Sequence, residues 1–199
     1  MIYVHRDWNK ITKEKLDALK ELSVALDAIE GVAERKAFIK ANQAAWSEVR
    51  HELSLMSFNK CWYTEAREAV SRYQTDHFRP HGRAKQAAKV YSEGYCWLAF
   101  DIENFRIVGV LANTQNQEYS EDTVGKADWF PLIEPEKRAT LASRSIANES
   151  PLLLDPVEQS DSNKISFNDN GEAHPSDDLS PEEKTLVDQS IIHLGIRQS

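Results

Sequence analysis

The period of the hydrophobic pattern changes near residue 57, and this change limits the folds that the chain can adopt. Over residues 10–57, apolar side chains such as Leu16, Leu19 and Leu26 recur at three- and four-residue steps, with charged residues between them. From residue 58 to residue 132, short apolar or aromatic runs alternate with polar loops, which is typical of short strands and turns with at most one brief helix. We therefore expect an α+β fold in which an antiparallel helix pair, interrupted at Gly31, precedes a part rich in strands.

The C-terminal part carries two strong local signals. Asn170 and Gly171 form a favourable tight-turn pair inside KISFNDNGEAH, which predicts a hairpin. The segment SPEEKTLVDQSIIHLG predicts a helix that Ser180 caps, that Glu183 closes with a capping box and that Gly195 ends. We divide the chain into a helical segment 1–57, a core 58–133 and an acidic extension 134–199, and expect them to pack together as one domain.

The formal net charge of −8 is distributed unevenly. Residues 145–199 hold 11 acidic side chains against 3 Lys and Arg, so the chain before them is neutral in sum. Residues 60–93 hold 7 Lys and Arg against 4 acidic residues and are locally cationic. Because attraction of phosphate depends on the local field, the net charge does not exclude a nucleic-acid ligand.

Several absences in the sequence favour a cytoplasmic protein without a membrane segment. No stretch approaches the ~20 continuous apolar residues of a membrane span. The N-terminus, MIYVHRDWNK, lacks the apolar core of a secretory signal. The spacing of Cys61 and Cys96 does not suggest a disulfide framework, which suits a reducing compartment.

The segment TDHFRPHG, residues 75–82, has an unusual density of polar side chains. Each such group costs roughly 1–3 kcal/mol if it is buried without a partner, so the segment is either an exposed loop or an active site. Phosphodiester hydrolysis needs a base, a divalent cation and cationic groups that hold the phosphate. Asp76 offers a hard oxygen ligand, His77 an imidazole that titrates near neutrality, and Arg79 a phosphate donor.

Six segments in order resemble the HNH endonucleases, and more narrowly the PtuB-like HNH proteins of Septu and retron-associated anti-phage systems. These segments are KCWYTE (60–65), DHFRPH (76–81), YCWLAFDIENF (95–105), GVLAN (109–113), GKADWFPL (125–132) and SPLLLDP (150–156). The resemblance implies a ββα-metal core and a metal-dependent endonuclease that hydrolyses nucleic acid as the effector of an anti-phage system. It also implies an ABC-type ATPase (PtuA-like) as partner, in retron systems together with a reverse transcriptase and its RNA–DNA hybrid.

The resemblance also implies a role for individual residues. His77 matches the general base, and Asn104 matches an asparagine that braces the base through its loop. Asp76 and Asn113 match the protein ligands of one Mg²⁺ or Mn²⁺, with Asn116 as an alternative to Asn113. Arg79 and Lys126 fall where phosphate contacts are expected.

The chain departs from the family where a structural zinc would be held by four cysteines. Cys61 remains, but Thr64, Gly109 and Ala112 occupy the other three positions, so no structural zinc is expected and packing of aromatic residues must replace it. This loss favours an alternative function, a catalytically silent HNH-like assembly subunit of the same complex. Retention of the four residues at the chemical positions favours the enzyme, and the sequence leaves open whether it cuts DNA or RNA.

Overall fold

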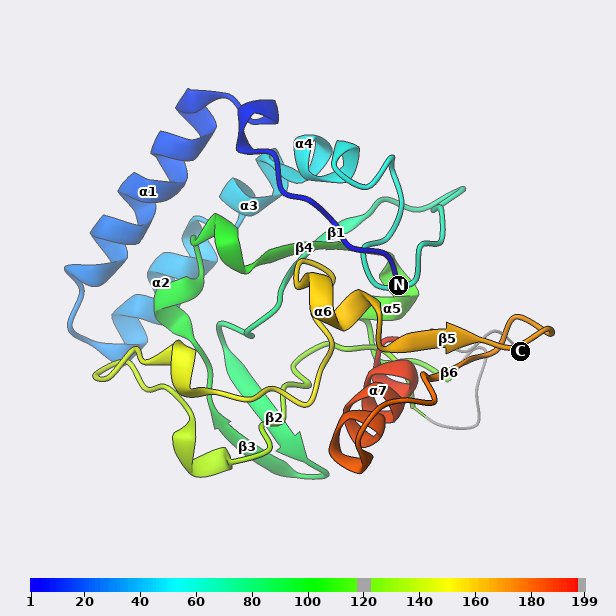
Figure 1. Cartoon of the computed structure of the whole chain (residues 1–199). Helices are drawn as coiled ribbons and strands as arrows, with labels where there is room; N and C mark the ends of the chain where they lie inside the picture. The colour runs from blue at the N-terminus through cyan, green and yellow to red at the C-terminus, as the bar shows by residue number, and fades with distance from the viewer. Residues whose placement is uncertain (118–122, 197–199) are drawn as a thin grey trace.

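The computed structural model describes residues 1–117 and 123–196, in which two-stranded antiparallel sheets lie among short and medium-length helices (Figure 1). Four helices form the N-terminal part: α1 (Lys13–Asp27), α2 (Val32–Ala41), α3 (Ala44–Glu48) and α4 (Arg50–Leu55). The middle part holds β1 (Gln74–His77), β2 (Arg83–Ala87), β3 (Val90–Glu93), β4 (Phe105–Val108) and α5 (Val110–Asn113). The C-terminal part holds α6 (Gln159–Ser162), β5 (Ile165–Phe167), β6 (Ala173–Pro175) and α7 (Pro181–His193). The predicted α+β class is therefore confirmed.

The N-terminal helices differ from the predicted pair in one respect. Helix α1 forms as expected and buries Leu19 and Leu26. The prediction of a single second helix was wrong, because this part of the chain forms three helices, α2, α3 and α4. At the end of α2 the backbone N–H and the side-chain Nδ2 of Asn42 both donate to the carbonyl of Phe38, at 3.1 and 2.9 Å. An asparagine side chain that bonds to a backbone carbonyl in this way competes with continuation of the helix.

Strand β1 pairs with β4 in an antiparallel sheet, although the β2–β3 hairpin lies between them in the chain. Asp76 is opposite Arg106, and His77 is opposite Phe105. Helix α5 begins two residues after β4 ends, so two strands and a short helix follow one another in space (Figure 1). Short strands and turns with at most one brief helix were predicted here. The strands are confirmed, but besides α5 the described part of residues 58–132 has two short 3-10 helices, Cys96–Leu98 and Ile102–Asn104. Within the polar segment after α5, residues 118–122 lie outside the described ones.

Two hydrophobic clusters flank the β1–β4 pair. One cluster packs the N-terminal helices against Phe105 and Ile107 of β4. The other packs Phe78, which follows β1, and Val108 of β4 with residues of α7. The paired strands therefore lie where the N-terminal and C-terminal parts of the chain meet.

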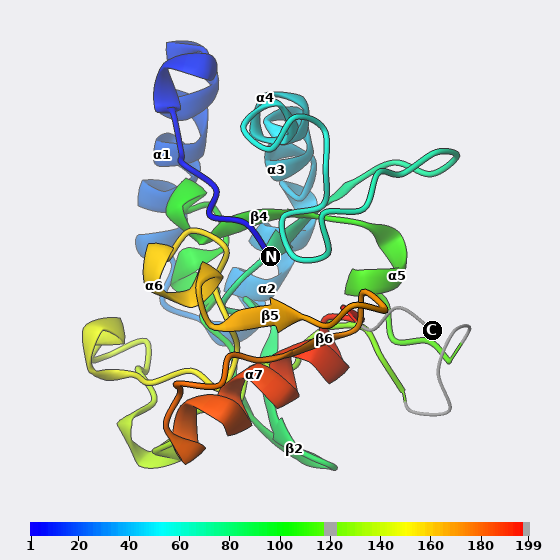
Figure 2. The ribbon, with the colours of Figure 1, turned by 45° about the vertical axis from the view of Figure 1, so that its right-hand side comes forward.

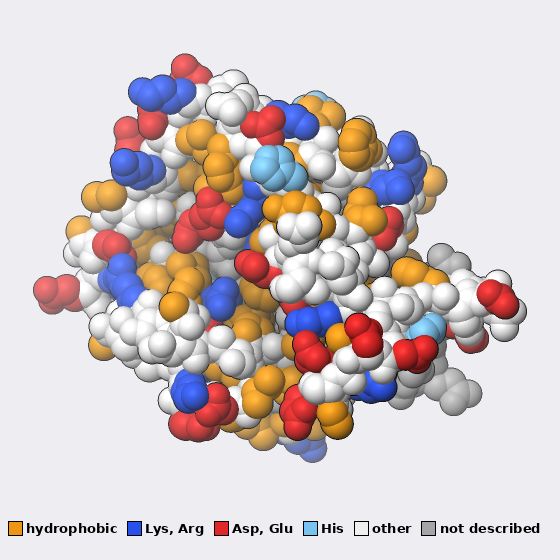
Figure 3. Space-filling view, viewed as in Figure 1, with side chains coloured by type: hydrophobic (Ala, Val, Ile, Leu, Met, Phe, Trp, Pro, Cys, Tyr) orange, Lys and Arg blue, Asp and Glu red, His pale blue; other side chains and the backbone are white. Residues whose placement is uncertain are grey.

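The C-terminal part forms as the sequence predicts. Gly171 has φ +81° in the turn between β5 and β6, and these strands lie beside α7 (Figure 2). Helix α7 has the complete capping box of Ser180 and Glu183, and Gly195 follows its end with φ +64°. Figure 3 shows acidic side chains gathered at the lower right of the molecule, where Figure 1 draws β5, β6 and α7. Among the described residues, no helix is long and apolar enough to cross a membrane.

A buried ion pair ties β4 to the C-terminal part. Arg106 donates from Nε and Nη2 to the two carboxylate oxygens of Asp155, at 2.7 and 2.6 Å. Removing one member of a buried pair leaves an uncompensated charge and costs about 3–5 kcal/mol.

We predict that Asp155→Ala lowers the free energy of unfolding by about this amount in denaturant titrations. Asp169→Ala, at the exposed tip of the β5–β6 hairpin, is the control and should change it by about 0.5 kcal/mol or less. Equal losses in the two variants would contradict the prediction.

Candidate functional site

Three of the predicted site residues meet at one hollow of about 310 Å³ beside the end of β1. Asp76 and His77 come from β1, and Asn113 is the last residue of α5. The lining is formed by Thr75, Asp76, His77, Pro80, His81, Gly82, Arg83, Asn113, Ala127 and Asp128. Because neighbouring side chains on a strand point to opposite faces, the side chains of Asp76 and His77 have different hydrogen-bond partners.

His77 is buried and fixed by one hydrogen bond and three ring contacts. Its Nε2 lies 2.9 Å from the carbonyl oxygen of Ala99. The ring meets Trp46, His81 and Phe105 edge-on, at centroid distances of 5.0, 4.5 and 5.2 Å. A carbonyl oxygen can only accept, so Nε2 carries the proton of the neutral imidazole and Nδ1 is left as an acceptor. This is the tautomer that a general base acting through Nδ1 requires.

The surroundings of His77 favour its neutral form. Burial, with a further effect of the nearby His81, lowers the pKa of His77 to about 3, against the partial opposition of the bond to Ala99. Burial also lowers the pKa of His81. Both imidazoles are therefore neutral at physiological pH.

Asp76 is buried in contact with two polar groups from distant parts of the chain. The Lys126 ammonium lies 3.1 Å from Oδ1 and 3.0 Å from Oδ2, and the Tyr63 hydroxyl donates to Oδ2 at 3.0 Å. Burial raises the pKa of Asp76 and lowers that of Lys126, while each charge favours the other. Burial also raises the pKa of Tyr63, which keeps it a hydrogen-bond donor.

Asn104 holds together the two loops that flank the site. Its Oδ1 accepts from the backbone N–H of Arg79 at 2.9 Å, and its Nδ2 donates to the carbonyl of Arg79 at 2.9 Å. The backbone carbonyl of Asn104 accepts from Phe78 at 2.8 Å. The side chain thus extends the β1–β4 pairing past the end of the strand, in agreement with a bracing role.

The two candidate asparagine ligands occupy different surroundings. Asn113 lines the hollow, and its Nδ2 donates to Oε1 of Gln74 at 2.7 Å, which leaves its Oδ1 as an acceptor. Asn116 donates from Nδ2 to the carbonyls of Leu111 and Thr114, at 2.8 and 2.7 Å. The geometry therefore favours Asn113 over Asn116 as a group that faces the hollow.

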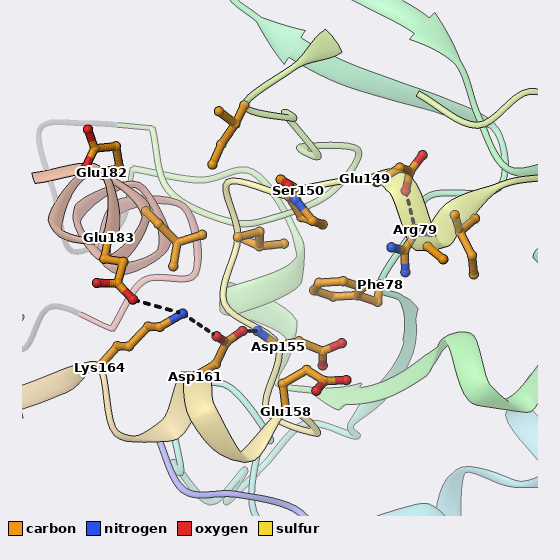
Figure 4. A pocket seen from close by; sticks show the side chains of 16 residues that line it. Phe78, Arg79, Glu149, Ser150, Asp155, Glu158, Asp161, Lys164, Glu182 and Glu183 are labelled. Carbon is orange, nitrogen blue, oxygen red and sulfur yellow. Dashed lines mark hydrogen bonds and ion pairs between the residues drawn. The ribbon is translucent and has the colours of Figure 1, made fainter. Parts of the chain in front are cut away.

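The two residues expected at phosphates are both paired with carboxylates. Lys126 is completely buried against Asp76 and so has no contact with solvent. Arg79 donates from Nε to Oε2 of Glu149 at 2.8 Å, and this pair borders a second, larger hollow of about 460 Å³ (Figure 4). Neither cation lines the hollow of Asp76 and His77, so their expected phosphate contacts remain predictions.

The donor types at the site fit a hard divalent cation, but their present partners limit its access. A carboxylate oxygen of Asp76 and the amide oxygen of Asn113 are ligands that Mg²⁺ accepts, with waters completing the shell. Among the described residues, no group of three or more His, Cys, Asp or Glu is placed to hold a metal ion. Both oxygens of Asp76 are moreover occupied by Lys126.

The positions of the missing zinc cysteines lie in packed structure. Cys61 and Ala112 are buried in the same hydrophobic cluster as Tyr63. Thr64 donates its backbone N–H toward the sulfur of Cys61 at 3.5 Å. Threonine, glycine and alanine side chains offer no thiolate or imidazole to a zinc ion, so the expected lack of a structural zinc stands as a prediction.

Sequence reasoning missed several residues of the site. Tyr63 and Trp46 were expected only to pack, and no role was given to Glu149. All three lie outside residues 75–82, so the polar segment gave no signal for them. His81 was signalled by its place in DHFRPH, although no role could be given to it.

No protein-family model matches this chain, and a search of curated proteins finds no match.

The lowered pKa of His77 predicts a dependence of stability on acid pH. The unfolded chain takes up this proton near pH 6.5 and the folded protein only near pH 3, so the unfolded state binds more protons between these values. The free energy of unfolding should therefore fall as pH decreases through this window. Between neutral pH and about pH 4.5, this one histidine should lower the free energy of unfolding by roughly 3 kcal/mol.

We predict that His77→Gln has a shallower decline than the wild type, measured by denaturant unfolding at a series of pH values. His5→Gln, at an exposed position, is the matched control and should keep the wild-type slope. A His77→Gln curve parallel to that of the wild type would show that this imidazole does not contribute to acid sensitivity.

Proposed function

We propose that this protein is a metal-dependent HNH endonuclease that hydrolyses phosphodiester bonds of nucleic acid. The observation that carries the proposal is the hollow at which β1, β4 and α5 bring Asp76, His77 and Asn113 together. Two antiparallel strands followed by a short helix are the arrangement expected of a ββα-metal core. The order and spacing of these residues agree with the family resemblance of the sequence.

His77 acts as the general base in this proposal. The bond from Nε2 to Ala99 selects the tautomer, and the edge contacts with Trp46 and Phe105 hold the plane of the ring. Nδ1 is then the atom that accepts a proton from the attacking water. Asn104 positions the base indirectly, since it pairs with the backbone of the loop that follows His77.

Asp76 and Asn113 would hold the divalent cation, with oxygen donors from β1 and from the end of α5. When bound, Mg²⁺ or Mn²⁺ supplies neutralisation of the charge that develops at the phosphate. His81 and Arg83 also line the hollow and can donate to a phosphate oxygen, although Arg83 now donates from Nε to the carboxylate of Asp128.

The proposed biological setting follows the same resemblance. The protein would be the effector of an anti-phage defence system in the cytoplasm, working with a PtuA-like ABC-type ATPase and, in retron systems, with a reverse transcriptase and its RNA–DNA hybrid. The acidic C-terminal extension and the N-terminal helices are the surfaces proposed for the ATPase. Because α7 buries Leu186, Val187 and Ile191, this contact is tested by surface substitutions and not by deletion of the extension.

A second candidate is a catalytically silent subunit of the same complex. The observation that favours it is the pairing of Lys126 with both oxygens of Asp76, which keeps the carboxylate from other cations.

Cleavage assays distinguish the endonuclease from the silent subunit. Plasmid DNA, single-stranded DNA and tRNA are incubated with Mg²⁺ or Mn²⁺, with and without the ATPase. Lack of cleavage in every arm would favour the silent subunit.

We predict that His77→Ala reduces cleavage by about 10²–10⁴-fold, the usual contribution of acid–base catalysis, while nucleic-acid affinity stays close to that of the wild type. Single-turnover rates measure the first quantity and fluorescence anisotropy the second, with circular dichroism to verify the fold. His5→Ala is the control and should cut normally. Cleavage by His77→Ala at the wild-type rate would overturn the HNH assignment.

We predict that Asn113→Ala raises the metal concentration needed for half-maximal cleavage, because one protein ligand is lost, and that raised Mn²⁺ restores part of the activity. The matched variant Asn116→Ala should keep the wild-type metal dependence, since its amide caps carbonyls of the α5 region. Metal titrations of the cleavage rate measure both. The opposite result, a shifted curve for Asn116→Ala alone, would assign the ligand to Asn116.

A further inference from the structure

The cation bound to Asp76 in this structure belongs to the chain itself. The Nζ of Lys126 lies 3.1 and 3.0 Å from the two oxygens of Asp76 and 2.8 Å from the carbonyl oxygen of His77. Its ammonium therefore spans the carboxylate edge at which a bound cation would have to sit. Lys126 is completely buried, although lysine is almost never found so unless it is paired.

The backbone around Lys126 is folded tightly onto the end of α5. The N–H of Lys126 donates to the carbonyl of Ala112 at 2.8 Å, and the N–H of Ala127 donates to that of Asn113 at 2.7 Å. Gly125 and Ala127, on either side, have φ +101° and +43°. Ala127 is thus in a conformation that residues with a Cβ rarely adopt, which persists only where the surroundings enforce it.

The same segment is attached to the C-terminal helix. Gly125 donates its N–H to the carbonyl of His193, the last residue of α7, at 3.1 Å. The ring of Trp129 stacks on that of His193 at a centroid distance of 3.8 Å. Residues 125–129 therefore connect α5, which carries Asn113, with α7.

We propose that Lys126 is the resident counter-ion of Asp76, and that a divalent cation gains Asp76 only when the Lys126 ammonium is displaced. The inference rests on the proposed function, because it concerns the metal of that site. A divalent cation and an ammonium on the same edge of one carboxylate repel each other, so the two states exclude one another. Once displaced, the ammonium is free to meet a phosphate oxygen, the role that the family resemblance implies for Lys126.

The first test measures Mn²⁺ affinity by isothermal titration calorimetry in the wild type and in Lys126→Met, which keeps the length of the side chain and removes its charge. Without its competitor, Asp76 should bind Mn²⁺ about tenfold more tightly or better, within the usual range of coupling between two ligands. The control Lys89→Met, at the exposed β2–β3 turn, should bind like the wild type. The double variant Asp76→Asn, Lys126→Met should lose the gain.

Equal or weaker Mn²⁺ binding by Lys126→Met would overturn the inference, and so would a lack of Mn²⁺ binding by both proteins. A second measurement uses the wild type and so does not depend on the folding of the variant. Amine acetylation followed by mass spectrometry reports the access of reagent to Lys126. Labelling should rise as Mn²⁺ is added, and continued protection of Lys126 at saturating Mn²⁺ would contradict displacement.

The outcomes for the inference and for the proposed function are separable. A protein whose Lys126 becomes reactive with Mn²⁺, but which cuts no nucleic acid with or without the ATPase, would keep the inference and overturn the nuclease. Cleavage that depends on His77 and Mn²⁺, with Lys126 still protected from acetylation, would support the nuclease and overturn the inference.

Discussion

The candidate site depends on the pairing of β1 with β4 and on the side chain that continues it. Where the two strands diverge, Asn104 donates to and accepts from the backbone of Arg79, so one amide replaces the next pair of strand hydrogen bonds. The carbonyl that holds His77 belongs to Ala99, in the same stretch of chain that Asn104 anchors. The loop before β4 therefore sets both the direction and the tautomer of the imidazole. An aspartate could not replace Asn104, because it has no N–H to offer the Arg79 carbonyl.

Burial of charge on this strand pair explains why remote segments are tied to it. Asp76 and Arg106 lie opposite each other and are both buried. Each takes a partner from elsewhere in the chain, Lys126 for the acid and Asp155 for the base. A buried charge left alone costs about 3–5 kcal/mol, a large part of the 5–15 kcal/mol that stabilises a typical domain. The segments that carry Lys126 and Asp155 are thus required for the strand pair to be stable.

The features that the sequence predicted are those that depend on neighbouring residues. The capping box of α7, the turn at Gly171 and the amphipathic α1 each need only a few adjacent positions. The break after α2 was missed because a single asparagine near an amphipathic run is compatible with either outcome until its side chain is seen to bond Phe38.

The candidate site was predictable in part for the same reason. The cluster of Asp76, His77 and Arg79 could be identified from its density of polar groups, and the resemblance added Asn104 and Asn113. The residues that pair with these charged groups could not be predicted, because they lie far away along the chain. Lys126 is 50 residues from Asp76, and Glu149 is 70 residues from Arg79. The resemblance implies phosphate contacts for both cations, whereas packing places each of them on a carboxylate.

The N-terminal helices have a direct part in the chemistry available to His77. Trp46 of α3 covers the ring edge-on, and its carbonyl accepts a hydrogen bond from Thr75 of β1 at 2.8 Å, so the helix and the strand are fixed together. This cover is part of the burial that lowers the pKa of His77 to about 3. An imidazole with so low a pKa is in the deprotonated form that a base needs at neutral pH, but it is a weak proton acceptor. On the proposed function, entry of water and phosphate into the hollow would relieve the desolvation and strengthen the base. The buried neutral His77 and the Asp76–Lys126 pair agree in that each satisfies its polar groups inside the protein. On the proposed function they describe the resting site, in which a substrate and a cation would replace the present contacts.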